Sequence, residues 1–364
     1  MVEVQNMSIV AVVFLSVLDV FAALTNTAIL CLVLPRTCMR TVSNLFLVGL
    51  SLTQFLMTVL VIPFSIVTLS QQSWQFGEGF CQFQGFFTIF LSISSATFIS
   101  VIAVDRYFSL ANPMSHTARV TSTHVLFTSI FNWFRAAFWA AFPLFGIDGL
   151  KYKFVPSING CRFRLDLKGS YSIYYYFIAM ESFLLTSFTM CIMYFKSFQT
   201  ARNSARQVRP GNIQIQVLQN GEFTSVAQTK NSFQSLKANV TLALIIGSFL
   251  LTRGPLAIFN IVTSFTSEGY FSAGTETTVY FMVFLGPLLD SLVYVLLNRK
   301  LRKEVFLILR KCVKKRSVEE EPKDIVDYLR TLTDNYVSTR NSSTEISWET
   351  VKDWWRCNRK IHLV

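Results

Sequence analysis

Long apolar stretches alternate with short polar segments along most of the chain. A helix needs about 20 mainly apolar residues to cross the hydrocarbon core of a bilayer. The pattern predicts seven such helices, at Ser8–Leu34, Thr41–Leu69, Gly79–Tyr107, Val125–Phe145, Ser172–Phe195, Ala238–Ser264 and Thr277–Leu297. The first is too long for a signal-peptide core and no small-residue cleavage site follows it, so we expect it to be retained. The predicted fold is an all-α membrane protein, a seven-transmembrane helix bundle.

The segments that flank the bundle are polar. Residues 1–7 form a short N-terminus, and residues 8–297 hold the seven-transmembrane bundle. Residues 298–312 mix basic and apolar side chains, which predicts a short amphipathic eighth helix on the membrane surface. Residues 313–364 contain no spanning candidate and are expected to be a disordered cytoplasmic tail.

Composition supports a lipid-facing surface. The chain is 52% hydrophobic and 15% charged, against about 25% charged in average globular domains. The net charge of +12 comes from basic residues between apolar blocks, a pattern of cytoplasmic loops near an anionic leaflet. Nucleic-acid binding needs a basic patch on a folded soluble surface, so no nucleic-acid partner is expected.

Basic residues also set the orientation. Arg36, Arg202 and Arg299 follow the first, fifth and seventh predicted helices, and Arg106 lies at the end of the third. This pattern places the N-terminus outside and the C-terminus inside. The loop 146–169 is an exception, because it is basic yet outside. On the outer side Asn6 begins a glycosylation sequon, very close to the first helix.

The strongest local motif is Asp105-Arg106-Tyr107, at the inner end of the third predicted helix. A carboxylate and a guanidinium at a membrane edge are costly unless paired or wetted, and a snorkelling arginine alone would also explain the pattern. With this triplet the chain resembles the rhodopsin-like (class A) family of G-protein-coupled receptors. The resemblance implies that the chain is no enzyme and signals to a heterotrimeric G protein, with arrestin and a receptor kinase as further partners.

The resemblance extends along the chain. Further matching positions are Asn26, Trp133, Pro143, Phe183, Tyr194, Phe249, Pro255 and Tyr294. It implies a disulfide between Cys81 and Cys161. It assigns Pro113 and Met114 to G-protein contact, together with the Asp105-Arg106-Tyr107 triplet, Tyr194 and Tyr294. The stretch from Ser43-Asn44 to Pro63-Phe64, with Val104-Asp105-Arg106-Tyr107, also resembles an orphan subgroup tied to primary cilia and Hedgehog signalling. It implies a plasma-membrane location, with the primary cilium as a second site.

Two departures from the family pattern concern the middle of the bundle. Gln54 stands where the family carries an aspartate in the second helix. The remaining carboxylate is Asp290, at the Asn/Asp position of the family's motif in the seventh helix. We expect a polar core of Asn26, Gln54, Ser95 and Asp290 that binds sodium weakly, because an amide replaces a charged oxygen ligand. The alternative is a protonated Asp290 hydrogen-bonded to Gln54.

The second departure is Arg253, which stands where the family has a tryptophan that works as a packing switch. An arginine cannot pack in that way and must find a partner or water. Three interpretations stay open: a pair with Glu181, a cavity-facing cation that binds an anionic ligand, or a degraded switch in a receptor without a diffusible ligand.

Two substitutions bear on the ligand. Thr88 stands at the position where amine receptors of the family carry an aspartate, and Phe284 stands where the retinal-binding members carry a lysine. The resemblance therefore disfavours a biogenic amine or a covalently bound retinal as the ligand. The ligand itself is unknown, and no cofactor or metal is expected. The candidate ligand-cavity residues are Thr88, Ser92, Glu181, Arg253, Asn260 and Tyr280.

The cytoplasmic side carries regulatory candidates. Ser235 stands where many members of the family carry an acid that pairs with the arginine of the third helix, here Arg106. Because this restraint on the inactive state is missing, we expect raised basal activity. Cys312 is either a palmitoylation site or a free thiol. The tail is either a plain solvated segment or a phosphorylated arrestin site. Its phosphorylation candidates are Ser338, Thr339, Ser342, Ser343 and Thr344.

Other classes of membrane protein remain as alternatives. Buried charges such as Asp19, Arg135 and Arg253 would suit a transporter or channel, but no internal repeat supports one. A receptor-like protein that does not couple to G proteins is a third reading. An intramembrane enzyme lacks support, because no metal-binding His pair, nucleophile motif or paired aspartates occur.

Overall fold

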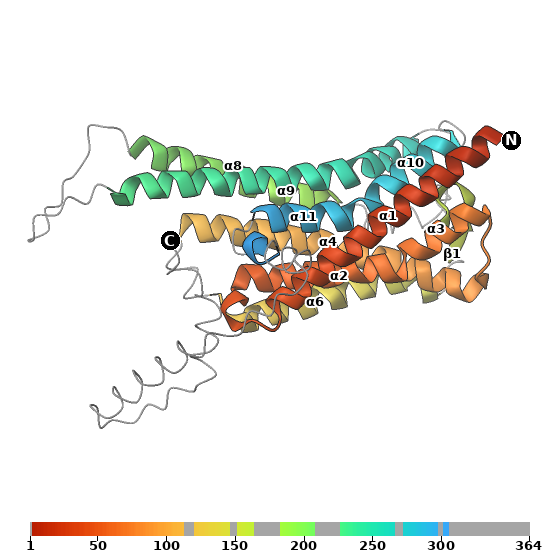
Figure 1. Ribbon diagram of the computed structural model, residues 1–364, viewed down its shortest axis with the longest axis horizontal. Helices are drawn as coiled ribbons and strands as arrows, with labels where there is room; N and C mark the ends of the chain where they lie inside the picture. Colours follow the sequence, from red (N-terminus) through yellow and green to blue (C-terminus); the bar gives the residue numbers. More distant parts are fainter. Residues whose placement is uncertain are drawn as a thin grey trace, which may run out of the picture.

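The computed structural model of the chain describes residues 2–112, 120–145, 151–163, 183–207, 226–265, 272–297 and 301–305. Long helices lie side by side along one axis (Figure 1). They are α1 (Val2–Val33), α2 (Val42–Leu60), α3 (Ile62–Gln71), α4 (Gly77–Ala111), α6 (Ser122–Ala141), α8 (Leu185–Gln207), α9 (Val226–Phe265), α10 (Ala273–Phe284) and α11 (Gly286–Leu297). The central helix is α4, which packs against α2, α6, α8 and α9.

Short turns and two strands complete the described elements. The turns are η1 (Thr37–Met39), η2 (Phe142–Phe145) and η4 (Pro156–Ile158). Strands β1 (Tyr152–Val155) and β2 (Gly160–Phe163) pair antiparallel, with Phe154 opposite Cys161. The sequence pattern did not predict this hairpin. Its strands are only four residues long, and a hairpin of that size depends on packing against the rest of the molecule.

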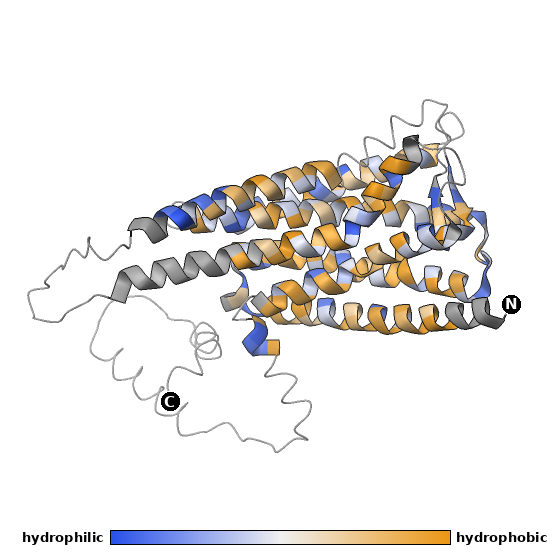
Figure 2. Ribbon diagram, turned by 90° about the horizontal axis from the view of Figure 1, so that it is seen from above, coloured by the Kyte–Doolittle hydropathy of each residue, from blue (hydrophilic) through white to orange (hydrophobic). Residues whose placement is uncertain are grey.

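The helices have the length and composition of membrane spans. Six described stretches are apolar enough to cross a bilayer, namely Ile9–Val33, Val42–Gln71, Gly77–Ala111, Ser122–Phe145, Ala243–Val262 and Gly274–Leu296. Each coincides with a predicted span. The remaining one, Ser172–Phe195, falls partly on residues 172–182, outside the described part. The chain is a multi-pass membrane protein, and Figure 2 shows apolar residues running along the helices, with polar residues concentrated near their ends.

The outer surface of α6 fits a lipid environment. Phe127, Phe131 and Phe134 are 69%, 66% and 72% exposed. They recur at helical spacing, so they form one apolar stripe on the outside of the bundle. Such a stripe is costly in water and matches hydrocarbon.

Two predicted helices are each divided in two. The predicted helix Thr41–Leu69 breaks at Val61 into α2 and α3, and Thr277–Leu297 breaks at Leu285 into α10 and α11. Both breaks come two residues before a proline, Pro63 or Pro287. Proline has no N–H to donate and its ring collides with the carbonyl of the preceding turn. Pro255 is tolerated, since α9 continues through it.

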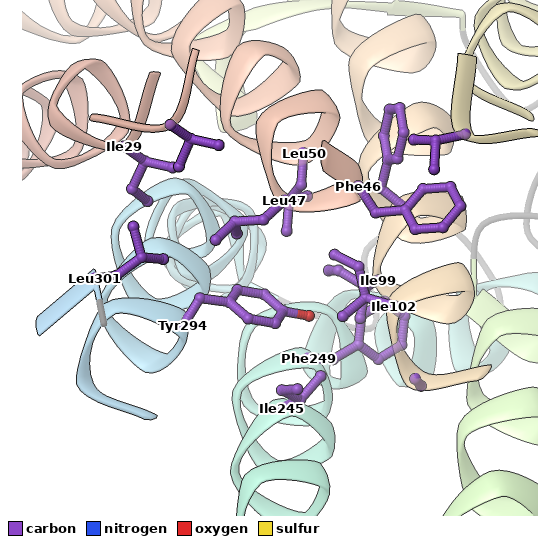
Figure 3. Close-up of a cluster of buried hydrophobic side chains, with 14 of the residues drawn as sticks. Ile29, Phe46, Leu47, Leu50, Ile99, Ile102, Ile245, Phe249, Tyr294 and Leu301 are labelled. Carbon is purple, nitrogen blue, oxygen red and sulfur yellow. The ribbon is translucent and has the colours of Figure 1, made fainter. Parts of the chain in front are cut away.

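A cluster of buried apolar side chains joins α1, α2, α4, α9 and α11 (Figure 3). Ile29, Leu47, Ile99 and Phe249 belong to it, with at most 1% of their surface exposed. Leu301 is fully buried in the same cluster and begins a helical turn at residues 301–305. The start of the predicted eighth helix therefore docks on the bundle, while the rest of the predicted segment 298–312 lies outside the described residues.

Candidate functional site

The hairpin is anchored at one end of the bundle, called the hairpin end here. Tyr152 is 1% exposed, and its hydroxyl donates to the carbonyl of Ala140 at 2.9 Å. A Cβ atom on Gly85 would overlap the Tyr152 ring, so only glycine lets the ring come this close to α4. Gln82 Nε2 donates to the Tyr152 carbonyl at 2.6 Å. The hairpin thus plugs into the helices rather than lying above them.

A disulfide and an ion pair fix the second strand. Cys161 is bonded to Cys81, at the start of α4, with the two Cα atoms 5.4 Å apart. This confirms the predicted disulfide. Arg162 Nη2 lies 2.5 Å from Glu276 Oε1 on α10, and its guanidinium lies 5.7 Å from the centre of the Tyr280 ring. Sequence reasoning missed the contact between Arg162 and Glu276, because nothing in either residue's neighbourhood marks the other.

The predicted ligand-cavity residues take several roles. Thr88 donates its hydroxyl to the carbonyl of Gln84, one turn earlier in its own helix, at 2.7 Å. The carbonyl of Ser92 accepts the hydroxyl of Ser95 at 3.0 Å. Tyr280 lies beneath Arg162, as described above, and Asn260 is half-buried on α9. Glu181 lies outside the described residues, so its predicted pairing with Arg253 stays a prediction.

The polar core lies in the middle of the bundle. Asp290 on α11 is 3% exposed, and both of its oxygens accept hydrogen bonds. Gln54 Nε2 donates to Oδ2 at 2.8 Å, and the Ser248 hydroxyl donates to Oδ1 at 3.1 Å. The expected contact between Gln54 and Asp290 is therefore present. Ser248 was not predicted, because its place on α9 follows no family motif.

Asn26 supports the polar core from α1. Its Nδ2 donates to the carbonyls of Ala22, at 2.8 Å, and Pro287, at 3.0 Å. The Pro287 carbonyl also accepts the Ser291 hydroxyl at 2.9 Å. Asn26 therefore ties α1 to the first turn of α11, beside the break that Pro287 causes.

Ser95 joins the core differently from the prediction. Its hydroxyl oxygen accepts a hydrogen bond from Arg253 Nη2 at 2.8 Å, and no bond to Asp290 occurs among the described residues. Arg253 also makes a contact that was not predicted. Its guanidinium lies 5.3 Å from the centre of the Phe249 ring, a cation–π distance, and Phe249 stacks on Phe183.

The opposite end of the bundle carries the predicted signalling motif and is called the Arg106 end here. The hydroxyl of Ser43 on α2 donates to a carboxylate oxygen of Asp105, which is 5% exposed. Arg106 Nε makes no hydrogen bond to any described residue. The carboxylate is thus held toward α2, and the guanidinium keeps a donor free.

The three aromatic residues predicted at this end differ in exposure. Tyr294 is 3% exposed and its hydroxyl has no partner in the described part of the chain, although it reaches into the apolar cluster (Figure 3). Tyr194 is 36% exposed and stacks on Phe198. Tyr107 packs its ring against Phe108. In this conformation no ring contact or hydrogen bond among the described residues joins Tyr194 to Tyr294.

Several predicted sites fall outside the described residues. These are Pro113, Met114, Cys312, Ser338, Thr339, Ser342, Ser343 and Thr344, together with the side chains of Asn6 and Ser235. They stay predictions.

Comparison with known proteins places this geometry in a family. Residues 25–294 match the family described as 7 transmembrane receptor (rhodopsin family). The chain is 26% identical to the G protein-coupled receptor 161 of Bos taurus and of Homo sapiens, over 79% of this chain and 57% of each relative. It is 25% identical to the trace amine-associated receptor 1 of Macaca mulatta, over 74% of this chain and 79% of that protein. The match thus spans less than three-fifths of the two receptors numbered 161.

Proposed function

Because this chain belongs to the rhodopsin family of seven-transmembrane receptors, we propose that it carries a signal across the plasma membrane to a heterotrimeric G protein. The observation that supports this proposal most is a pair of unsatisfied polar groups at the Arg106 end. Arg106 Nε and the Tyr294 hydroxyl are buried and lack partners within the described residues. Buried polar groups without partners are costly, so a rearrangement or a bound protein that satisfies them would be favoured.

Movement of α9 would link the middle of the bundle to the Arg106 end. Helices α8 and α9 extend beyond the other helices at this end (Figure 1). The hydrogen bond from Ser248 to Asp290 holds α9 against α11 at mid-depth. An outward swing of α9 would open a space around Arg106, Tyr194 and Tyr294 for the G protein. A ligand would shift the equilibrium between the closed and the opened arrangement of α9 only by binding one of the two better than the other.

The residues of the predicted ligand cavity argue against one class of ligand, the cationic amines. One relative is named for trace amines, and a cationic amine calls for a buried carboxylate. Thr88 stands at the matching position and donates its hydroxyl to its own helix. We therefore do not extend amine recognition to this chain. A signal that arises without ligand fits equally well, because Ser235 offers no acid to restrain Arg106.

The wider setting follows from the family. We propose a plasma-membrane location with the N-terminus outside, and the subgroup resemblance adds the primary cilium. Arrestin and a receptor kinase would act on Ser338, Thr339 and Ser342–Thr344, and lipid would contact the eighth helix and a palmitoylated Cys312.

The test is basal signalling in transfected cells. A panel of G-protein and arrestin sensors, run without ligand, should read above mock for the wild type because the restraint on Arg106 is missing. Arg106→Ala should return the reading to mock at equal surface expression.

The matched control removes a different basic residue. Arg36→Ala deletes one partner of a partly exposed ion pair with Glu304, which contributes little, and should leave the signal unchanged. A wild type that reads as mock across the panel would contradict the proposal.

A further inference from the structure

Asp290 is a buried carboxylate in the middle of the bundle whose hydrogen-bond donors carry no positive charge. It is 3% exposed, and its two hydrogen-bond donors, Gln54 and Ser248, are both neutral. An ionised carboxylate at this depth costs several kcal/mol, and neutral donors offset only part of that cost. A counter-charge is therefore needed if the group is to stay ionised.

Arg253 approaches the same place from the neighbouring helix α9. Arg253 Nη2 and Asp290 Oδ2 lie 3.8 Å and 3.9 Å from one point, the position that a Cβ atom would take on Gly286. Among the described residues, Arg253 is the cation placed near Asp290 at this depth of the bundle. Both charged groups therefore lie close to Gly286, although they make no direct ion pair with each other in the described part of the chain.

Other contacts hold the guanidinium in this position. Nη2 donates to Ser95 on α4 at 2.8 Å, and the Phe249 ring lies 5.3 Å away. Nε and Nη1 make no hydrogen bond to any described residue, so the group has spare donors. The arginine is thus oriented by α4 and α9, with Nη2 close to the same glycine of α11 as the Asp290 carboxylate.

We propose that Arg253 is the built-in counter-cation of Asp290, and that this tethered charge closes the polar core to free monovalent cations. A mobile cation would need the oxygens of Asp290, Ser248 and Ser95, since hard cations take oxygen ligands. The guanidinium already uses Ser95 and repels a second positive charge at short range. The proposal explains why the core should bind sodium poorly, and it does not depend on G-protein coupling.

The experiment measures thermal unfolding of the purified full chain in detergent, in sodium chloride and in choline chloride of equal ionic strength. The wild type should unfold at the same temperature in both salts. Arg253→Gln opens the oxygen site, so its unfolding midpoint should be about 2–4 °C higher in sodium chloride than in choline chloride. Arg253→Gln combined with Asp290→Asn should lose this difference.

Two controls separate the charge from other effects of substitution. Arg253→Lys keeps a cation at the site and should show no sodium response. Arg135→Gln removes an intramembrane arginine that bonds Thr97 on α4 at 2.5 Å, away from Asp290, and should also show none.

Each outcome decides the proposal. A sodium-specific rise in the wild type, or none in a folded Arg253→Gln, would overturn it. If Arg253→Gln does not fold, the wild type and Asp290→Asn decide the proposal together. That variant should be less stable than the double variant, because it leaves Arg253 as an uncompensated buried charge. The reverse order of stability would also overturn the proposal.

Discussion

At the residue scale, single substitutions in a family pattern change what the middle of the bundle can do. Gln54 keeps a hydrogen bond to Asp290 but brings no charge, and Arg253 brings a charge where an aromatic ring is usual. Sequence reasoning predicted the first contact, because both residues sit at motif positions. It could not predict that Arg253 would bond Ser95, since that contact depends on side-chain conformations on two different helices.

Gln54→Leu tests the polar core directly. The substitution removes the donor to Asp290 Oδ2, and leaving one oxygen of a buried carboxylate without its partner costs about 1–3 kcal/mol. We expect a lower unfolding temperature of the purified protein. Thr58→Val is the matched control on the same helix, because within the described part of the chain the Thr58 hydroxyl bonds only its own helix, at the carbonyl of Phe55. Equal stability of Gln54→Leu and the wild type would show that the bond contributes nothing.

At the element scale, the positions of the helices could be predicted from the sequence, whereas the breaks within two of them could not. Apolar runs placed the helices, but α2 and α3 are separate, as are α10 and α11. Pro63 and Pro287 carried the signal for both breaks, yet Pro255 lies within a continuous α9, so a proline alone does not decide. The hairpin was missed for another reason. Its register depends on Tyr152 entering a gap beside Gly85, which no local pattern reveals.

Tyr152→Ala tests whether the hairpin is a structural plug. Deleting a buried aromatic side chain costs about 3–5 kcal/mol in well-packed sites, and the hydroxyl bond to Ala140 is lost too. We expect a marked fall in thermal stability. Tyr152→Phe loses only the hydroxyl bond and should cost about 0.5–1.5 kcal/mol. If both variants unfold at the same temperature, burial of the ring is not what holds the hairpin.

At the scale of the whole molecule, the hairpin end and the Arg106 end lie at opposite ends of α4. Cys81 begins this helix and Asp105–Tyr107 lie near its end, so one helix spans the distance that a signal must cross. Six of the seven predicted spans coincide with apolar helices among the described residues, because long apolar runs are a strong local signal. Pairings between distant segments, such as Arg162 with Glu276, were beyond sequence reasoning because single-sequence patterns describe only local periodicity.

Membrane topology provides a prediction at this scale. Epitope tags on the two chain ends should differ in accessibility in intact cells, with the N-terminal tag labelled and the C-terminal tag hidden until the membrane is permeabilised. The physical reason is the excess of Lys and Arg after the first, third, fifth and seventh helices. Labelling of both tags in intact cells would contradict an odd number of crossings.

Nucleotide exchange on a purified G protein tests the central claim most directly. The receptor is reconstituted in lipid nanodiscs with a set of purified heterotrimers, and GTP-analogue binding is followed without ligand. We predict that the wild type accelerates exchange on at least one heterotrimer and that Arg106→Ala does not, at equal folded amounts. Exchange no faster than with empty nanodiscs for every heterotrimer, or an Arg106→Ala variant as active as the wild type, would contradict the account.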